Sequence, residues 1–180
     1  MKLSFFFLLF FSVSSTFAQD EAPGQRSLGV QSSFAVSFSG YSVSLAAVYK
    51  VAYNEFYLGP VLSISNSYLP GSGPWGFNTG WRYNYANHKN VGAFAMIDYR
   101  NAFYRAFDPA NLRSPKWNSI HEVNVALGFK WQFAPLWVFN AALGTGVYME
   151  RNHDISGDQL INHSGYSNLL KATFLRQLSK

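Results

Sequence analysis

The sequence predicts an all-β fold, an eight-stranded antiparallel up-and-down transmembrane β-barrel. Three observations carry this prediction. Apolar residues recur at every second position, which is the period of a β-strand and not the 3.6 of a helix. Only 13% of the 180 residues are charged while 18% are aromatic, whereas a soluble domain typically has about 25% charged residues. After its first segment, the chain has no apolar run of about 18 residues that could form a membrane helix.

The composition also excludes several chemistries. No cysteine is present, so the chain can hold no disulfide, thiolate metal site, cysteine nucleophile or lipidated cysteine. The formal net charge of +5 comes from scattered residues, which does not favour nucleic-acid binding.

The first 18 residues have the pattern of an export signal. Lys2 is followed by the apolar run 3–11, and small residues stand at Thr16 and Ala18, the positions that a signal peptidase reads. A membrane anchor helix is the alternative, but it needs about 20 apolar residues. We therefore expect a signal peptide over residues 1–18, cleavage after Ala18, a short N-terminal segment over 19–25 and a barrel over 26–180.

The alternation begins at Leu28 and predicts a first strand over residues 28–38 and a second over 41–50, joined by a tight turn at Ser39-Gly40. Six further segments alternate in the same way: residues 56–65, 77–85, 91–100, 121–131, 137–147 and 168–178. The last is the least regular, because Arg176 falls on its apolar face while Leu169 and Leu175 fall on its polar face.

The connections between these segments alternate in length. Connections two, four and six are short, at residues 54–55, 86–90 and 132–136, while connections three, five and seven are long, at 66–75, 101–119 and 150–165. Consecutive connections of an antiparallel meander lie at opposite ends, so one end carries tight turns and the other long loops, as in outer-membrane barrels. Only the first connection departs from this parity.

The side-chain volumes indicate which face points inward. A lipocalin-like barrel would hold the apolar face inside, but the many Trp, Phe and Tyr residues of that face exceed the bore of an eight-stranded barrel. The opposite face is rich in Gly, Ser, Ala and Asn, and it carries a few charges of both signs. These charges predict a polar plug in the lumen, or alternatively the lining of a narrow pore: Arg82, Asp98, Arg100, Glu122, Lys130 and Lys171.

With these features the chain resembles the small outer-membrane barrels of the OmpA or OmpX kind over residues 26–178, and its Ala18-Gln19 junction resembles export signals of Bacteroidota. The resemblance implies a monomer in the outer membrane, in contact with membrane lipids and lipopolysaccharide, without a cofactor. The chain departs from it by ending in Leu178-Ser179-Lys180 instead of a terminal aromatic residue. Pro60 also interrupts the apolar face of the third strand, where we expect a bulge or a break.

The fifth connection is the most concrete binding candidate. It mixes cations with aromatic rings, which suits anionic sugars or lipopolysaccharide, although a loop that only packs on the rim is equally compatible. The candidate residues are Arg105, Phe107, Arg113, Lys116 and Trp117.

Two other polar groups favour no specific chemistry. The seventh connection holds potential metal ligands in a spacing that matches no known motif, and we expect no metal there; its polar residues are Arg151, His153, Asp154, Asp158 and His163. Ser119 and His121 share a face and could form a nucleophile and its base. Their order is the reverse of that in lipid A deacylase barrels, and no carboxylate lies on their face.

The sequence therefore predicts a non-enzymatic barrel that anchors and presents its loops for surface binding or membrane integrity. A lipid A-modifying barrel enzyme and a narrow pore for small solutes are the alternatives.

Overall fold

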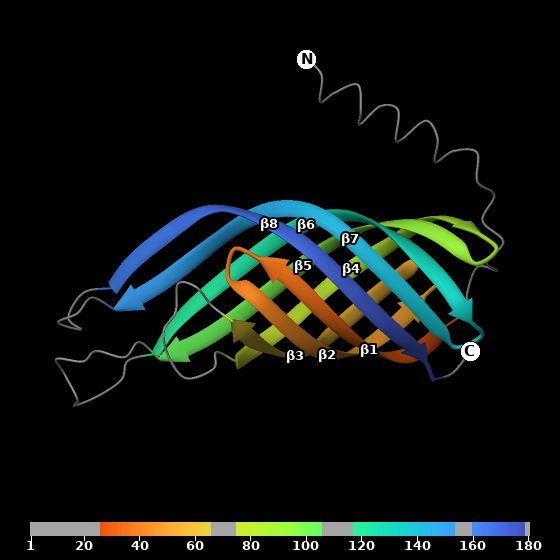
Figure 1. Ribbon diagram of the computed structural model, residues 1–180, viewed down its shortest axis with the longest axis horizontal. Helices are drawn as coiled ribbons and strands as arrows, with labels where there is room; N and C mark the ends of the chain where they lie inside the picture. The colour runs from red at the N-terminus through yellow and green to blue at the C-terminus, as the bar shows by residue number, and fades with distance from the viewer. Residues whose placement is uncertain (1–25, 66–74, 106–116, 154–159, 179–180) are drawn as a thin grey trace, which may run out of the picture.

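Eight antiparallel strands in the described part of the chain close into a barrel (Figure 1). The computed structural model describes residues 26–65, 75–105, 117–153 and 160–178. The strands are β1 (Arg26–Ser37), β2 (Gly40–Val51), β3 (Asn54–Ser65), β4 (Trp75–His88), β5 (Val91–Arg105), β6 (Trp117–Ala134), β7 (Trp137–His153) and β8 (Leu160–Gln177). Each strand pairs with its neighbours in sequence, and β8 pairs with β1. The predicted fold class is confirmed. No described helix is long and apolar enough to cross a membrane.

The strands are longer than the sequence predicted, so the connections are shifted or shorter, as the second and the seventh illustrate. The second turn lies at Ala52-Tyr53 instead of 54–55, because Val51 pairs with Asn54 and Ala52 takes a φ of 50°. Pairing of β7 with β8 continues to His153 and Leu160, which reduces the seventh connection to residues 154–159. The alternation of apolar residues does not reveal these strand ends. A strand end outside the apolar zone of the wall does not need an apolar face.

The β1–β2 hairpin is short compared with the other side of the barrel. Phe38 and Ser39 form its turn, and Gly40 follows with a φ of 94°, which suits glycine. β1, β2 and β3 have 12 residues each, while β6, β7 and β8 have 17 or 18. The hairpin tip therefore ends well before the tips of β5 to β8 (Figure 1). This first connection is the one that did not follow the expected alternation of short and long connections.

Pro60 produces a local break without a change of register. The β2–β3 ladder pairs Ser44 with Val61 and resumes with Ala47 and Leu58, so the step beside Pro60 carries no pairing. A proline has no N–H to donate to that ladder. The register shift between these strands lies elsewhere, at Tyr41 and Ser42. The expected break is therefore present, and the bulge is not at Pro60.

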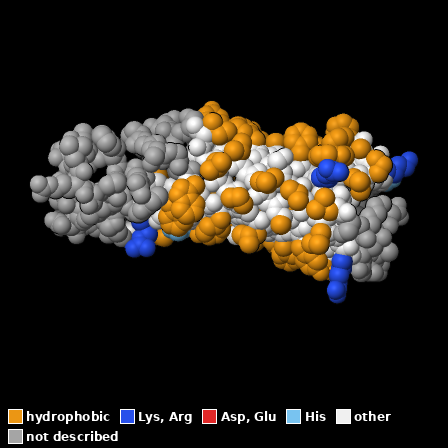
Figure 2. Space-filling view, turned by 90° about the horizontal axis from the view of Figure 1, so that it is seen from below, with side chains coloured by type: hydrophobic (Ala, Val, Ile, Leu, Met, Phe, Trp, Pro, Cys, Tyr) orange, Lys and Arg blue, Asp and Glu red, His pale blue; other side chains and the backbone are white. Residues whose placement is uncertain are grey.

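The outer wall of the barrel is apolar. Large exposed side chains cover it on every strand, among them Leu28, Leu45, Leu58, Trp81, Ile97, Phe129, Leu143 and Phe174. Figure 2 shows one face of this wall, where hydrophobic side chains lie between Lys or Arg side chains near the two ends, and no acidic side chain is visible. The predicted assignment of the aromatic face to the outside agrees with these positions.

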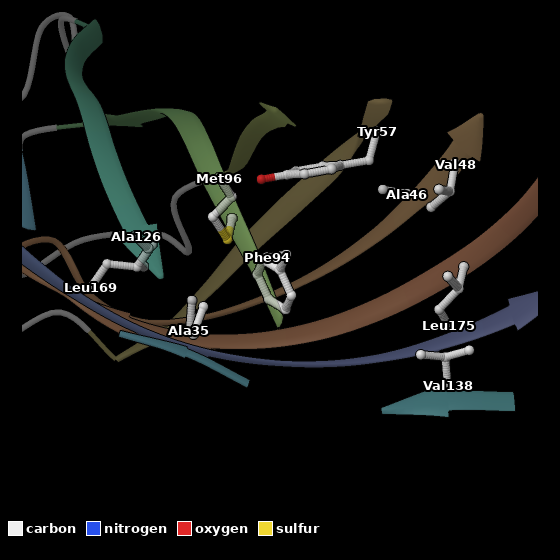
Figure 3. Close-up of a cluster of buried hydrophobic side chains, with 11 residues drawn as sticks. Ala35, Ala46, Val48, Tyr57, Phe94, Met96, Ala126, Val138, Leu169 and Leu175 are labelled. Carbon is white, nitrogen blue, oxygen red and sulfur yellow. The ribbon is translucent and has the colours of Figure 1, made fainter. Parts of the chain in front are cut away.

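Buried side chains fill the interior, which contains an apolar cluster as well as polar groups (Figure 3). Phe94 and Met96 project from β5 and are almost fully buried, and Leu169 and Leu175 of β8 face the lumen as their parity predicted. A Cβ atom placed at Gly128 would collide with the Phe94 ring. The small residues of the inward face thus leave the room that the large ones occupy.

Candidate functional site

The lumen holds three groups of buried charges, and the first lies near the short-turn end. Arg82 Nη1 lies 2.5 Å from Glu55 Oε2, and both side chains are almost fully buried. Asn84 donates to the other oxygen of Glu55 at 3.1 Å. The Arg82 guanidinium also lies 4.9 Å from the centre of the Phe94 ring, within the range of cation–π attraction. Arg82 and Glu55 therefore neutralise each other inside the barrel.

The second group lies in the middle of the lumen. Lys171 Nζ of β8 lies 2.5 Å from Asp98 Oδ1 of β5 and donates to Asn78 Oδ1 at 3.0 Å. Asn78 donates in turn to Asp98 at 3.0 Å, and the Tyr57 hydroxyl donates to the same carboxylate. Lys171 also lies 4.5 Å from the centre of the Tyr57 ring. Four strands are thus joined across the bore by one hydrogen-bonded network.

The third group closes the end that carries the long loops. Glu122 forms an ion pair with Arg100 and accepts hydrogen bonds from Ser37 at 2.9 Å and Ser167 at 3.1 Å. Ser39, in the β1–β2 turn, also donates to this carboxylate. Phe38 of the same turn stacks on Tyr148 of β7 with ring centres 3.6 Å apart and planes 8° apart. The short hairpin is thereby folded over the lumen.

All six predicted lumenal residues are buried: Arg82, Asp98, Arg100, Glu122, Lys130 and Lys171. Sequence reasoning missed Glu55, because the dipeptide at 54–55 was taken as a turn. It also missed the contribution of the turn residue Ser39. Continuing the alternation of β3 one step back from Tyr57 would have placed Glu55 on the inward face.

The predicted loop-binding residues are only partly within the described residues. Phe107, Arg113 and Lys116 lie outside them, whereas Arg105 and Trp117 pair as the end of β5 and the start of β6. Binding of an anion by this loop therefore stays a prediction.

The polar residues predicted for the seventh connection do not share one loop where the structure describes them. Arg151 is exposed on β7, His153 pairs with Leu160, and His163 of β8 lies opposite Glu150. Asp154 and Asp158 lie outside the described residues. The described segments contain no group of three or more His, Asp or Glu side chains that could hold a metal ion. The loop assignment was wrong for Arg151, His153 and His163, because the β7–β8 pairing includes all three.

Ser119 and His121 are brought together on the outer wall. His121 Nε2 lies 3.2 Å from Ser119 Oγ, while Nδ1 lies 2.8 Å from the Tyr99 hydroxyl and 3.1 Å from Asn101 Nδ2. An amide nitrogen can only donate, so with this amide orientation Nδ1 accepts and Nε2 of the neutral ring carries the proton. His121 then donates to Ser119, whereas a general base would have to accept its proton.

Comparison with known proteins shows the fold. The structure is similar to Neisserial surface protein A (NspA), with a TM-score of 0.52 and 13% identity over 84% of this chain and 96% of that one. It is also similar to the N-terminal β-barrel domain of Pseudomonas aeruginosa OprF, with a TM-score of 0.52 and 12% identity over 84% of this chain and 98% of that one. No family model matches the sequence, and no curated protein matches it. The chain thus has the eight-stranded barrel fold of small outer-membrane proteins.

Proposed function

We propose that the chain is an integral outer-membrane protein whose filled barrel is a rigid, non-enzymatic anchor for its longer connections. The observation that carries the proposal is the inverted distribution of side chains. Charged pairs such as Glu55–Arg82 and Asp98–Lys171 are buried in the lumen, while large apolar side chains such as Leu143 are exposed on the wall. That arrangement is stable when the outer wall contacts lipid and not water.

The connections opposite the short turns are the functional part of this proposal. The fifth connection would bind anionic sugars or lipopolysaccharide through Arg105, Arg113 and Lys116, with Phe107 and Trp117 as stacking surfaces. A barrel crossed by buried networks holds such loops at fixed positions. Deleting residues 106–116 should abolish binding of the isolated polysaccharide part of lipopolysaccharide while the barrel remains folded.

The two alternatives have less support. A narrow pore needs a continuous aqueous path, and buried ion pairs and rings occupy the bore at several levels. A lipid A-modifying enzyme needs Ser119 to donate its proton to His121, whereas the hydrogen bonds of Asn101 and His121 favour the opposite direction. The lipid A mass spectrum should be unchanged on deletion or overexpression of the protein.

The decisive experiment is heat-modifiable gel migration of the membrane fraction from cells that express the full chain. A folded outer-membrane barrel resists detergent until it is heated and then migrates differently, so we expect two positions, before and after boiling. Recovery of the chain in the aqueous fraction, with a single position, would overturn the proposal.

A further inference from the structure

The outer wall carries one polar patch beside the end where the long loops emerge. Ser119 of β6 lies opposite Arg151 of β7, and Arg151 lies opposite Asn162 of β8, so that three polar residues form one row. Residues directly opposite one another on one face have Cβ atoms about 5 Å apart. The row therefore places the guanidinium of Arg151 between a hydroxyl on one neighbouring strand and an amide on the other.

Toward the middle of the barrel the polar patch gives way to apolar side chains, beginning with Met149 beside His121. His121 and Met149 lie one step below the row, and Val123 and Val147, both exposed, lie one step further. The phenol of Tyr99 supports His121 from β5. In a membrane-embedded barrel, this is the transition from the apolar wall to the headgroup layer.

In the described segments, cations are exposed on the outside of the barrel and acidic side chains are not. In the described segments the acidic side chains Glu55, Asp98, Glu122 and Glu150 all lie on inward-facing positions. The exposed cations of these segments are Arg26, Lys89, Arg151 and Arg176. Arg151 forms no ion pair or hydrogen bond with any described residue. Among the described residues its guanidinium therefore has no anionic partner, and it lies at a point where lipid headgroups would supply one.

The hydrogen-bond donors of the patch also suit an anionic ligand. With the Asn101 amide oriented as above, His121 Nε2 donates to Ser119 Oγ, which leaves the hydroxyl proton of Ser119 for an outside acceptor. A guanidinium and a hydroxyl on adjacent strands are suitable partners for two oxygens of one phosphate group.

We infer that Ser119, Arg151 and Asn162 form a binding site for the phosphate of a membrane-lipid headgroup, on the wall of the barrel and separate from the loops. This inference rests on the proposed membrane location and extends it. It requires no part of the fifth connection, so the site should persist when residues 106–116 are deleted.

The test is native mass spectrometry of the full chain in detergent, titrated with lipid A that carries two phosphates and with its dephosphorylated counterpart. We expect the phosphorylated lipid to bind preferentially and Arg151→Gln to weaken its binding about tenfold, the effect of losing one charge-assisted contact. Arg151→Lys should restore part of the affinity, and Ser119→Ala should weaken binding about threefold. Arg26→Gln removes another exposed cation, at the opposite end of the barrel, and is the matched control.

Several results would overturn the site. These are equal binding of both lipids, equal losses in Arg151→Gln and Arg26→Gln, or displacement of the lipid by millimolar inorganic phosphate, which would indicate a free-phosphate site. Gel migration before heating establishes that each variant is folded. A chain that never enters bilayers would overturn the proposed function as well, whereas one that enters without lipid preference would overturn the site alone.

Discussion

Ser39 at the tip of the first hairpin donates two hydrogen bonds to Glu122 of β6, from its backbone N–H at 3.3 Å and from its hydroxyl at 3.1 Å. The two residues are 83 positions apart in the chain. The contact explains why the first connection is short although it lies at the end of the long loops. Its turn closes the lumen, whereas a longer loop would extend away from the carboxylate.

Removing that carboxylate should destabilise the barrel strongly. Glu122→Ala would leave Arg100 buried without its ion-pair partner and would free Ser37, Ser39 and Ser167. We expect a loss of about 3–5 kcal/mol in the free energy of unfolding, measured by urea titration in lipid vesicles. Glu150→Ala, at the less enclosed mouth, is the control and should cost less. Equal losses in the two variants would contradict the central role of Glu122.

The pair formed by Lys171 and Asp98 should behave as a coupled unit. Either Lys171→Met or Asp98→Asn leaves one buried charge without its counter-charge, so each should destabilise the barrel. The double variant removes both charges and should be less destabilised than the sum of the single variants, by about 0.5–3 kcal/mol. Simple additivity in the unfolding titrations would contradict the interaction.

A charge on the middle of the outer wall should distinguish lipid from water as the surrounding solvent. Leu143 is 69% exposed on β7, and Leu178 is 60% exposed just after β8. In a bilayer Leu143→Arg should cost about 2–4 kcal/mol and Leu178→Arg at most about 1 kcal/mol. In a soluble barrel both substitutions would fall within about 0.5 kcal/mol of zero. Folding yields and unfolding titrations in vesicles measure the difference.

The filled lumen should not conduct ions steadily. Buried pairs occupy it at the levels of Glu55, Asp98 and Glu122, and the Phe38–Tyr148 stack covers one end. Planar-bilayer recordings of the purified chain should therefore show no stable channels. Steady conductance that changes in Arg82→Ala or Glu122→Ala would favour the pore alternative instead.

Sequence reasoning located the faces of the strands better than their ends. Parity alone assigned Leu169 and Leu175 to the interior despite their apolar character, because the direction of a strand side chain depends only on its position. Glu55 was missed because the turn is made by Ala52 with a positive φ, which residue preferences do not favour for alanine.

The partners of the lumenal charges were beyond sequence reasoning. Alternation shows that Arg82 and Asp98 face inward, but it does not show which opposite charge each one meets. That choice depends on the register of strands that are distant in sequence and on the tilt of the barrel. The Ser39–Glu122 contact depends in addition on how far the hairpin tip bends inward. No local sequence pattern predicts the register and tilt of the barrel or the inward bend of the hairpin tip.

The Lys171–Asp98 pair has a consequence for the order of assembly. Lys171 is on the strand that completes the ring by pairing with β1, and Asp98 is on β5, 73 residues earlier. A partly formed sheet that lacks β8 therefore holds an uncompensated carboxylate facing its concave side. Closure of the seam brings Lys171 to that carboxylate before it is fully buried, so we expect open sheets to be disfavoured as resting intermediates and folding to be cooperative.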